Sequence, residues 1–367
     1  MTAALTPSNA LRVLVVSDGN APSATQRISF GQPFDGGDGD AAVGVSFEPH
    51  HEDAAQIKAA FDRAHPDLLV LSRYTSPRGI DWIALARDAR IPVVYHIDDD
   101  LLAVPESLGA AKFKAYNRPE RVQALRDNIE ASDLFYVSTG ELKKRYEEHG
   151  VRVPTVAGDV YCSVAPGDIG ALVAPATGPV IGYMGTGGHS ADLAMVMPAV
   201  CEVMDEVPSL NFEVFGTIKM PGELERFGRR VRHVPPVADY ADFIPYLRSL
   251  GWWVGLAPLE DNAFNRCKAD TKWVEYSLAG MAVVASDTVV YRRACEGGAG
   301  LLACGPAAWR QGILDLLLSP ALRAATISAA QRKLEACYTH EQLRRQVLAV
   351  FSQAFELARQ SGHVRDA

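Results

Sequence analysis

The chain has 367 residues, of which 48% are hydrophobic and 22% charged, and its formal net charge is −8. This length exceeds what one hydrophobic core usually organises, so we expect two globular domains and not a disordered chain. The negative charge argues against nucleic acid as the main partner, because binding a phosphate backbone requires a concentrated excess of Lys and Arg.

The six cysteines form no CxxC pair and no metal-like spacing, so we interpret them as reduced thiols. The N-terminal segment lacks a basic stretch followed by a long apolar run, and no other segment has the length and apolarity of a membrane span. The sequence therefore predicts a cytoplasmic protein.

The first half of the chain alternates short Val, Leu and Ile runs with amphipathic stretches, which is typical of a parallel sheet covered by helices. Strands are predicted at 12–17, 42–47, 67–72, 92–97 and 134–138. Helices are predicted at 52–64, 80–89, 119–131 and 140–148.

The second half repeats this pattern after a Pro-, Gly- and Ala-rich segment, 164–178, which we interpret as a hinge. Strands are predicted at 179–184, 212–215, 233–237, 252–256, 282–285 and 301–303. Helices are predicted at 190–206, 240–250, 268–279 and 340–358.

The predicted fold class is α/β, with two doubly wound Rossmann-like domains that face a cleft. The first domain would span 11–165 and the second 178–338. The remaining segment, 339–367, would be a C-terminal helix long enough to cross back to the first domain.

One predicted helix, 268–279, carries a pattern with chemical meaning. Lys268, Lys272 and Glu275 are spaced i, i+4 and i+7, which places them on one stripe. Two ammonium groups beside a carboxylate suit a diphosphate attached to a ribose, since lysine neutralises phosphate and a carboxylate accepts hydrogen bonds from hydroxyls. The alternative is a solvated helix face with an ordinary ion pair.

The run GLAPLEDNAFNRCKADTKWVEYSLAGMAVVASD around this helix resembles the donor-binding segment of GT-B glycosyltransferases, in particular the retaining family 4 enzymes. Glu275 takes the place of the family's ribose-binding glutamate. Cys267 falls where the family has an earlier glutamate. Asn265, Arg266, Lys268 and Lys272 instead resemble the Asn/Lys pattern of a bacterial polysaccharide-type branch.

A glycine-rich turn follows the first strand of the second half, at Gly185, Thr186, Gly187 and Gly188, and leads through His189 into a helix. Such a turn frees backbone N–H groups to face an anion at a helix N-terminus, and the resemblance places it beside the donor phosphates. Glycine-rich turns are also common without a ligand, and a histidine there is often a helix cap or a surface residue.

Two arginines of the first half are candidates for the acceptor side or the cleft. Arg27 lies in a segment that resembles the family's Pro-Ser-x-x-Arg loop, and Arg73 ends a predicted strand. Ligands of open α/β sheets bind at the carboxyl ends of strands. Either arginine could equally be an ordinary surface residue.

Three consecutive acids, Asp98, Asp99 and Asp100, end another predicted strand. A metal-binding DxD motif, a solvated loop and an acceptor site are the three interpretations. In the third, the strand resembles the family's strand that ends in His-Asp, with Asp98 in place of the histidine, as a general base or an acceptor-orienting group. We predict catalytic roles for Asp98, Asp99 and Lys272, and an acceptor or cleft role for Asp100.

The resemblance implies a transferase that moves a sugar from a nucleotide-diphosphate sugar to a glycan, lipid-linked or protein acceptor, for example in polysaccharide biosynthesis. It implies no metal and no other cofactor, because lysines and a helix N-terminus supply the positive charge. Family 4 membership would imply retention, whereas Asp98 as a true base would imply inversion. The rivals are a sugar-nucleotide epimerase of the same fold and a non-catalytic scaffold.

Two basic stretches, 112–126 and 226–233, are most simply solvated helix faces. Their alternative role is weak attachment to an anionic membrane surface, which would place the protein peripherally at the inner face of the membrane. The sequence does not indicate the oligomeric state.

Overall fold

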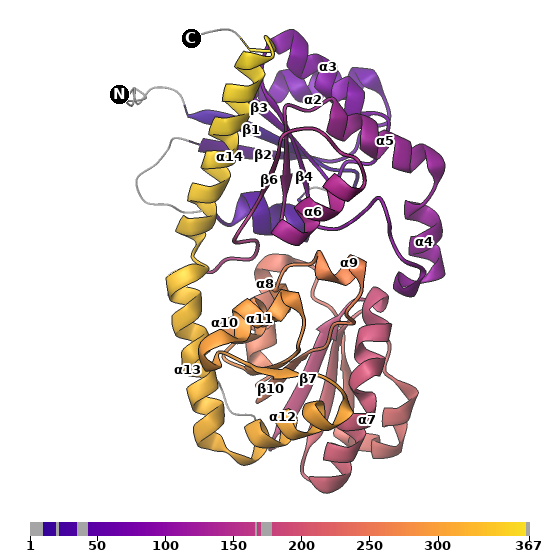
Figure 1. Cartoon of the computed structure of the whole chain (residues 1–367), viewed down its shortest axis with the longest axis vertical. Helices are drawn as coiled ribbons and strands as arrows, with labels where there is room; N and C mark the ends of the chain where they lie inside the picture. Colours follow the sequence, from indigo (N-terminus) through magenta and orange to yellow (C-terminus); the bar gives the residue numbers. More distant parts are fainter. Residues whose placement is uncertain (1–9, 20–21, 35–42, 166, 170–177, 365–367) are drawn as a thin grey trace. The chain divides into compact units, whose positions relative to one another are not determined.

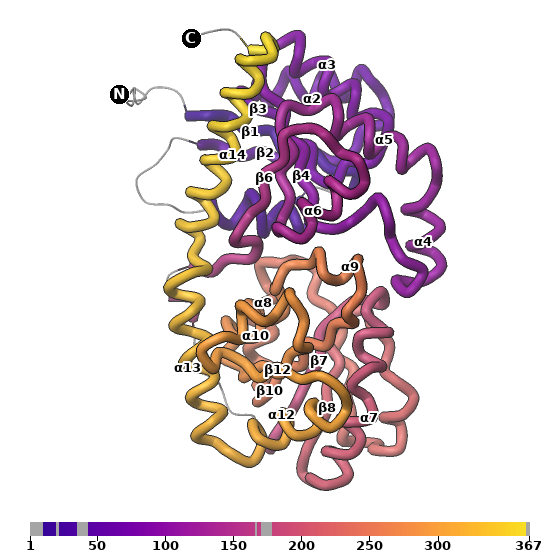
Figure 2. Tube along the Cα trace, in the orientation of Figure 1, coloured from indigo at the N-terminus to yellow at the C-terminus, as the bar shows by residue number. Residues whose placement is uncertain are grey.

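The computed structural model describes residues 10–19, 22–34, 43–165, 167–169 and 178–364. The chain forms two compact units (Figures 1 and 2). The first unit contains the described residues within 1–103, 115–161 and 340–367, and the second those within 104–114 and 162–339. The C-terminal helix therefore belongs to the first unit, where it contacts two strands of the sheet.

The first unit is built on a six-stranded parallel sheet in the order β2-β1-β3-β4-β5-β6. Its strands are β1 (Leu11–Val16), β2 (Val43–Glu48), β3 (Leu68–Ser72), β4 (Val93–Ile97), β5 (Leu134–Val137) and β6 (Thr155–Ala157). The strands β3, β4 and β5 are buried along their whole length, which explains their continuous apolar sequences. The strand order reverses direction between β1 and β3.

The helices of this unit follow the strands in alternation. They are α1 (Ala24–Gln26), the π-helix η1 (Arg27–Gly31), α2 (Ala54–Ala64), α3 (Gly79–Ala89), α5 (Pro119–Glu130), α6 (Gly140–Glu148) and α14 (His340–Gln360). Helix α4 (Ala110–Tyr116) ends at the return of the chain to this unit.

The second unit contains another six-stranded parallel sheet, in the order β12-β11-β10-β7-β8-β9. Its strands are β7 (Val180–Gly185), β8 (Asn211–Gly216), β9 (Val231–Val234), β10 (Val254–Ala257), β11 (Ala282–Ser286) and β12 (Leu301–Ala303). This is the strand order of a dinucleotide-binding Rossmann fold, and it reverses direction between β7 and β10.

Helices and short turns connect these strands. They are η2 (Glu106–Leu108), η3 (Gly187–His189), α7 (Ser190–Glu206), η4 (Gly222–Arg230), α8 (Tyr240–Ser249), α9 (Ala263–Arg266), α10 (Thr271–Leu278), α11 (Val289–Cys295), η5 (Glu296–Gly298), α12 (Pro306–Leu318) and α13 (Pro320–Cys337). Helices α7 and α12 pack on one face of the sheet and complete a core that includes Val200, Phe212 and Trp309.

The predicted α/β fold class with two Rossmann-like sheets is confirmed. The predicted helix 268–279 is wrong at its start. Asn262 caps the short helix α9, and α10 begins only after Asp270, so Lys268 lies in the connection between them. Sequence reasoning also missed β6, an edge strand whose three residues are only partly buried. Ala42 and, within the predicted hinge, residues 166 and 170–177 lie outside the described residues.

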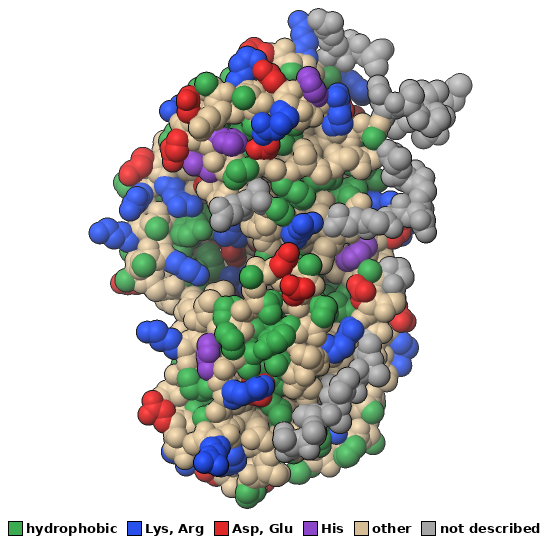
Figure 3. Space-filling view, turned by 180° about the vertical axis from the view of Figure 1, so that it is seen from behind, with side chains coloured by type: hydrophobic (Ala, Val, Ile, Leu, Met, Phe, Trp, Pro, Cys, Tyr) green, Lys and Arg blue, Asp and Glu red, His purple; other side chains and the backbone are tan. Residues whose placement is uncertain are grey.

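No single helix in the described part of the chain is long and apolar enough to cross a membrane. Helices α12 and α13 meet the length and composition criteria only as a pair bent by 101°. On the face drawn in Figure 3, basic and acidic side chains are interspersed in both halves of the molecule.

Candidate functional site

The candidate site of the second unit lies at the carboxyl ends of β7 and β10, where the strand order reverses. Open α/β sheets bind ligands at this position, because the connections on either side diverge there and leave backbone groups accessible. Strand β7 ends at Gly185 and is followed by η3 and by α7, a helix of 17 residues. The glycine-rich turn thus precedes the N-terminus of a long helix, where backbone N–H groups favour an anion.

A buried carboxylate, Asp192, joins the two loops of this site. Its Oδ2 atom lies 2.9 Å from Nδ1 of His189, on the turn after β7. Its Oδ1 atom accepts the backbone N–H of Glu260 at 2.9 Å and the amide of Asn265 at 3.3 Å, both after β10. Asp192 is only 4% exposed, so it holds these residues in a fixed arrangement.

Two lysines lie near this arrangement. The ammonium group of Lys272 is 5.8 Å from the centre of the Tyr183 ring on β7, and that of Lys268 is 4.7 Å from the Phe264 ring. The charge of Lys272, burial and the charge of Lys268 together lower the pKa of His189 to about 4. The imidazole is therefore neutral at physiological pH and sits in a positive electrostatic environment.

Glu275 lies on α10 and is 7% exposed. Burial raises the pKa of its carboxyl group to about 7, although a hydrogen bond from Tyr240 and the charge of Lys272 act in the opposite direction. The Tyr240 hydroxyl donates to Oε1 at 2.9 Å, and the Sγ atom of Cys162 lies 3.9 Å from that hydroxyl. The other carboxylate oxygen makes no hydrogen bond to the described residues, so it is available to a ligand.

The structure thus brings His189, Asn265, Lys268 and Lys272 together, but the predicted helix stripe is wrong for Lys268, which precedes α10. Arg266 forms an exposed ion pair with Asp261 at 2.6 Å. Gly185, Thr186 and Gly187 form the turn as predicted from the sequence. The assignment of these residues to a donor remains a prediction.

Sequence reasoning missed three side chains of this site. Asp192 carries a local signal, since it follows His189 at i+3 on the first turn of α7. Tyr240 carries none, because it lies 35 residues from Glu275. Lys112 also carries none, yet a Cβ atom at Gly188 would lie 2.9 Å from its ammonium nitrogen.

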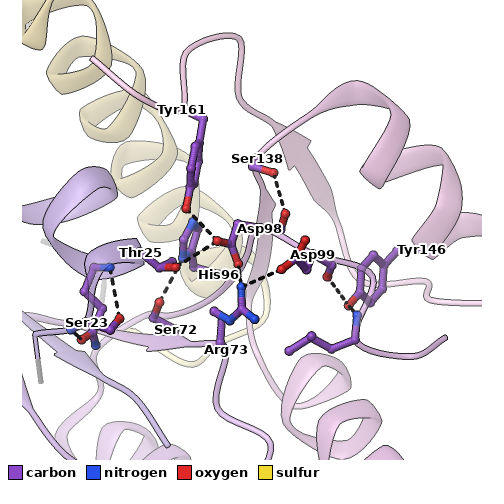
Figure 4. Close-up of polar contacts among 12 residues, drawn as sticks. Ser23, Thr25, Ser72, Arg73, His96, Asp98, Asp99, Ser138, Tyr146 and Tyr161 are labelled. Atoms are coloured by element: carbon purple, nitrogen blue, oxygen red, sulfur yellow. Dashed lines mark hydrogen bonds and ion pairs between the residues drawn. The ribbon is translucent and has the colours of Figure 1, made fainter. Parts of the chain in front are cut away.

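A second polar cluster lies at the carboxyl ends of β3 and β4 in the first unit (Figure 4). Arg73, with the unusual positive φ of 52°, pairs with Asp98 and, at 3.1 Å, with Asp99. The hydroxyls of Thr25 and Tyr161 donate to Asp98 Oδ2 at 3.0 and 2.7 Å. Both oxygens of Asp98 therefore already accept hydrogen bonds.

The remaining candidates of the first unit have different surroundings. Asp100 is buried between Arg145, at 3.0 Å, and His149, at 3.0 Å, and its partners belong to α6 and its end. Arg27 begins η1. Thr25, two residues earlier in the same segment, donates its hydroxyl hydrogen bond to Asp98. The structure thus brings Arg73, Asp98 and Asp99 together, and it directs Asp100 toward α6.

In the described ranges, no group of three or more His, Cys, Asp or Glu side chains is arranged to hold a metal ion. The acids Asp98 and Asp99 converge on an arginine and not on one another.

At the level of sequence, no family model matches the chain, and no curated protein matches it. Its structure, however, is similar to those of known proteins. Sucrose-phosphate synthase from Thermosynechococcus elongatus superposes with a TM-score of 0.65 at 14% identity, covering 94% of this chain and 99% of that one. HepE of Anabaena, solved with UDP and glucose, gives 0.64 at 16% identity, covering 93% and 99%.

A trehalose-phosphate synthase from Burkholderia xenovorans gives a TM-score of 0.61 at 13% identity, covering 93% of this chain and 98% of that one. The chain therefore belongs to the α/β fold class with two Rossmann-like units. More particularly, the chain has the GT-B fold.

Proposed function

We propose that this protein is a glycosyltransferase that moves a sugar from a nucleotide-diphosphate sugar to an acceptor hydroxyl. The observation that carries the proposal is the arrangement at the ends of β7 and β10. There, a glycine-rich turn before a helix is accompanied by Lys268, Lys272, a neutral His189 and the buried Glu275. The similar HepE structures contain UDP or UDP-glucose, so UDP is the nucleotide that we propose.

On the donor side, the turn and the lysines would hold the diphosphate, because both present positive charge to an anion. Glu275 would accept hydrogen bonds from the ribose hydroxyls through its available oxygen. Lys272 would act in catalysis by neutralising the negative charge that develops on the leaving diphosphate. These groups supply the charge without a metal, and we therefore expect turnover to persist in EDTA.

On the acceptor side, we propose Asp98, Asp99, Arg73 and Arg27 as the groups that bind or orient the acceptor. Asp98 already accepts hydrogen bonds from Arg73, Thr25 and Tyr161, which favours an orienting role over that of a base that takes a proton. The acceptor itself, whether glycan, lipid-linked or protein, would be found by screening. We propose a cytoplasmic reaction, with peripheral attachment to the membrane if the acceptor is lipid-linked.

Calorimetry with UDP and UDP-sugars, followed by a sugar-transfer assay, tests the proposal and separates it from its rivals. An epimerase would convert the UDP-sugar when no acceptor is present. A scaffold would bind no nucleotide. Transfer of the sugar to an added acceptor, with release of UDP, is the result that we expect.

Donor affinity should depend on pH through Glu275. Ribose hydroxyls favour the ionised carboxylate, so the affinity for a UDP-sugar should rise with pH until the pH exceeds the Glu275 pKa of about 7. At pH 6 the dissociation constant should be roughly tenfold larger than at pH 8, because one pH unit below the pKa only about a tenth of the carboxyl group is ionised.

Calorimetry of an intact UDP-sugar is the appropriate measurement, since its diphosphate has no titration step in this range. Glu275→Gln should abolish the pH dependence. Stability has the opposite sign: the pKa of Glu275 is raised from its usual 4.5, so its contribution to stability is present below pH 4.5 and is lost as pH rises to about 7. An affinity that is equal at pH 6 and 8 would contradict the assignment of Glu275.

Lys112 should make a small electrostatic contribution to the affinity for UDP. Its ammonium group lies against Gly188 of the turn, and it is exposed to solvent. We expect Lys112→Ala to weaken UDP binding by roughly two- to fivefold, with a loss that shrinks at high salt. Lys114→Ala is the matched control, because Lys114 is an exposed lysine of the same helix. Equal effects of the two variants would show only a general charge effect.

A further inference from the structure

The hydrogen bonds of Asp192 determine which ring nitrogen of His189 carries the proton. An ionised carboxylate only accepts hydrogen bonds, and the Asp192 carboxylate also accepts the Glu260 N–H and the Asn265 amide. The hydrogen bond between Asp192 Oδ2 and His189 Nδ1 therefore requires the proton to be on Nδ1.

A neutral imidazole with its proton on Nδ1 has a lone pair on Nε2. The positive charges of Lys272 and Lys268 and the burial of the ring disfavour a second proton, and they lower the pKa of His189 to about 4. His189 is thus a hydrogen-bond acceptor after the end of β7, near the charges of Lys272 and Lys268.

A bound nucleotide-diphosphate sugar offers few partners to such an acceptor. Phosphate oxygens carry no proton and cannot donate to Nε2. The ribose hydroxyls are assigned to Glu275, which lies on a different element, α10. The remaining donors are the uracil N3–H and the hydroxyl groups of the transferred sugar. Of these, the sugar is the group attached directly to the diphosphate that the lysines would hold.

We propose that His189 Nε2 accepts a hydrogen bond from a hydroxyl group of the sugar being transferred, and that Asp192 is the positioning residue that fixes the ring and its tautomer. The inference rests on the proposed function and adds a contact specific to the sugar. It predicts that the second unit distinguishes a UDP-sugar from UDP through one side chain. Asn265 and the Glu260 N–H act indirectly, since they hold Asp192.

Calorimetry of His189→Leu with UDP and with a UDP-sugar tests this contact. We expect roughly three- to tenfold weaker binding of the UDP-sugar and unchanged binding of UDP, as for the loss of one hydrogen bond. His189→Gln, whose side-chain oxygen also accepts, should recover part of the affinity. Equal weakening of UDP and UDP-sugar would place His189 against the phosphates and overturn the inference.

The test of Asp192 requires a measurement that distinguishes a positioning role from a general loss of folding. Magnetic resonance of nitrogen-labelled histidine should show Nδ1 protonated and Nε2 unprotonated in the native protein. Asp192→Asn should shift this tautomer equilibrium while UDP still binds. An unchanged tautomer would overturn the positioning role, whereas failure of the native protein to bind any nucleotide would contradict the proposed function itself.

Discussion

Replacing Lys272 with alanine should reduce kcat/KM for sugar transfer by about 10²–10³-fold, the range found when a group that stabilises transition-state charge is removed. Lys272 is the first cause of the low His189 pKa and also acts on the pKa of Glu275. Its charge therefore influences both the turn and the helix α10. Because the leaving diphosphate gains negative charge as the glycosidic bond breaks, most of the loss should appear in kcat.

Steady-state kinetics with a saturating acceptor, together with calorimetry for UDP, would measure this effect. Lys268→Ala should have a smaller effect, since its charge is a lesser cause of the His189 pKa. Lys143→Ala is the control, because Lys143 lies on α6 in the first unit and forms an i,i+4 pair with Glu147. Unchanged donor binding and turnover in Lys272→Ala would show that the donor-site assignment is wrong.

Arg73→Leu should lower the free energy of unfolding of the chain by about 3–5 kcal/mol, because it removes one partner of a largely buried charge cluster. Asp98 and Asp99 have side-chain exposures of 12% and 23% and both pair with this guanidinium. Without it, the hydroxyls of Thr25 and Tyr161 would be the remaining partners of Asp98 in the cluster. Leucine keeps a Cβ atom, so the cost of the positive φ at this position is unchanged.

Urea unfolding followed by both fluorescence and circular dichroism would measure this loss and show whether the two units unfold together. The double variant Arg73→Leu with Asp98→Asn should recover part of the stability, since it leaves fewer unpaired charges. Arg78→Leu is the matched control, because the Arg78 side chain is 45% exposed and pairs with the exposed Asp81. If the free energy of unfolding falls no more than in the control, solvent must stabilise the charges of Asp98 and Asp99 when the arginine is absent.

The Asp98→Asn variant also tests the acceptor-side prediction. Asparagine keeps the shape and accepts hydrogen bonds, but it cannot take a proton. If Asp98 orients the acceptor, activity should fall moderately, and the stereochemistry of the product would report whether a base is required. Complete loss of activity in a folded variant would favour Asp98 as the base.

The sequence by itself determined most of the strands and the fold class. Strands such as β3 and β11 are buried on both faces, so their apolar runs identify them without tertiary information. Helix α7 was predicted with its observed bounds, because its apolar periodicity is long and begins after a glycine-rich turn. The same local pattern placed Gly185, Thr186, Gly187 and His189 at a strand end.

Only the tertiary structure decided which side chains meet. Asp192 contacts the Glu260 N–H 68 residues away, and Asp98 meets Thr25 across 73 residues. Such contacts depend on the strand order, which no local pattern encodes, since β10 lies beside β7 and β4 beside β3. Lys268 shows the converse: its spacing suggested a helix stripe, but the break between α9 and α10 placed it in a loop. Spacing along a sequence fixes geometry only inside a continuous element, and the ends of elements depend on capping and packing.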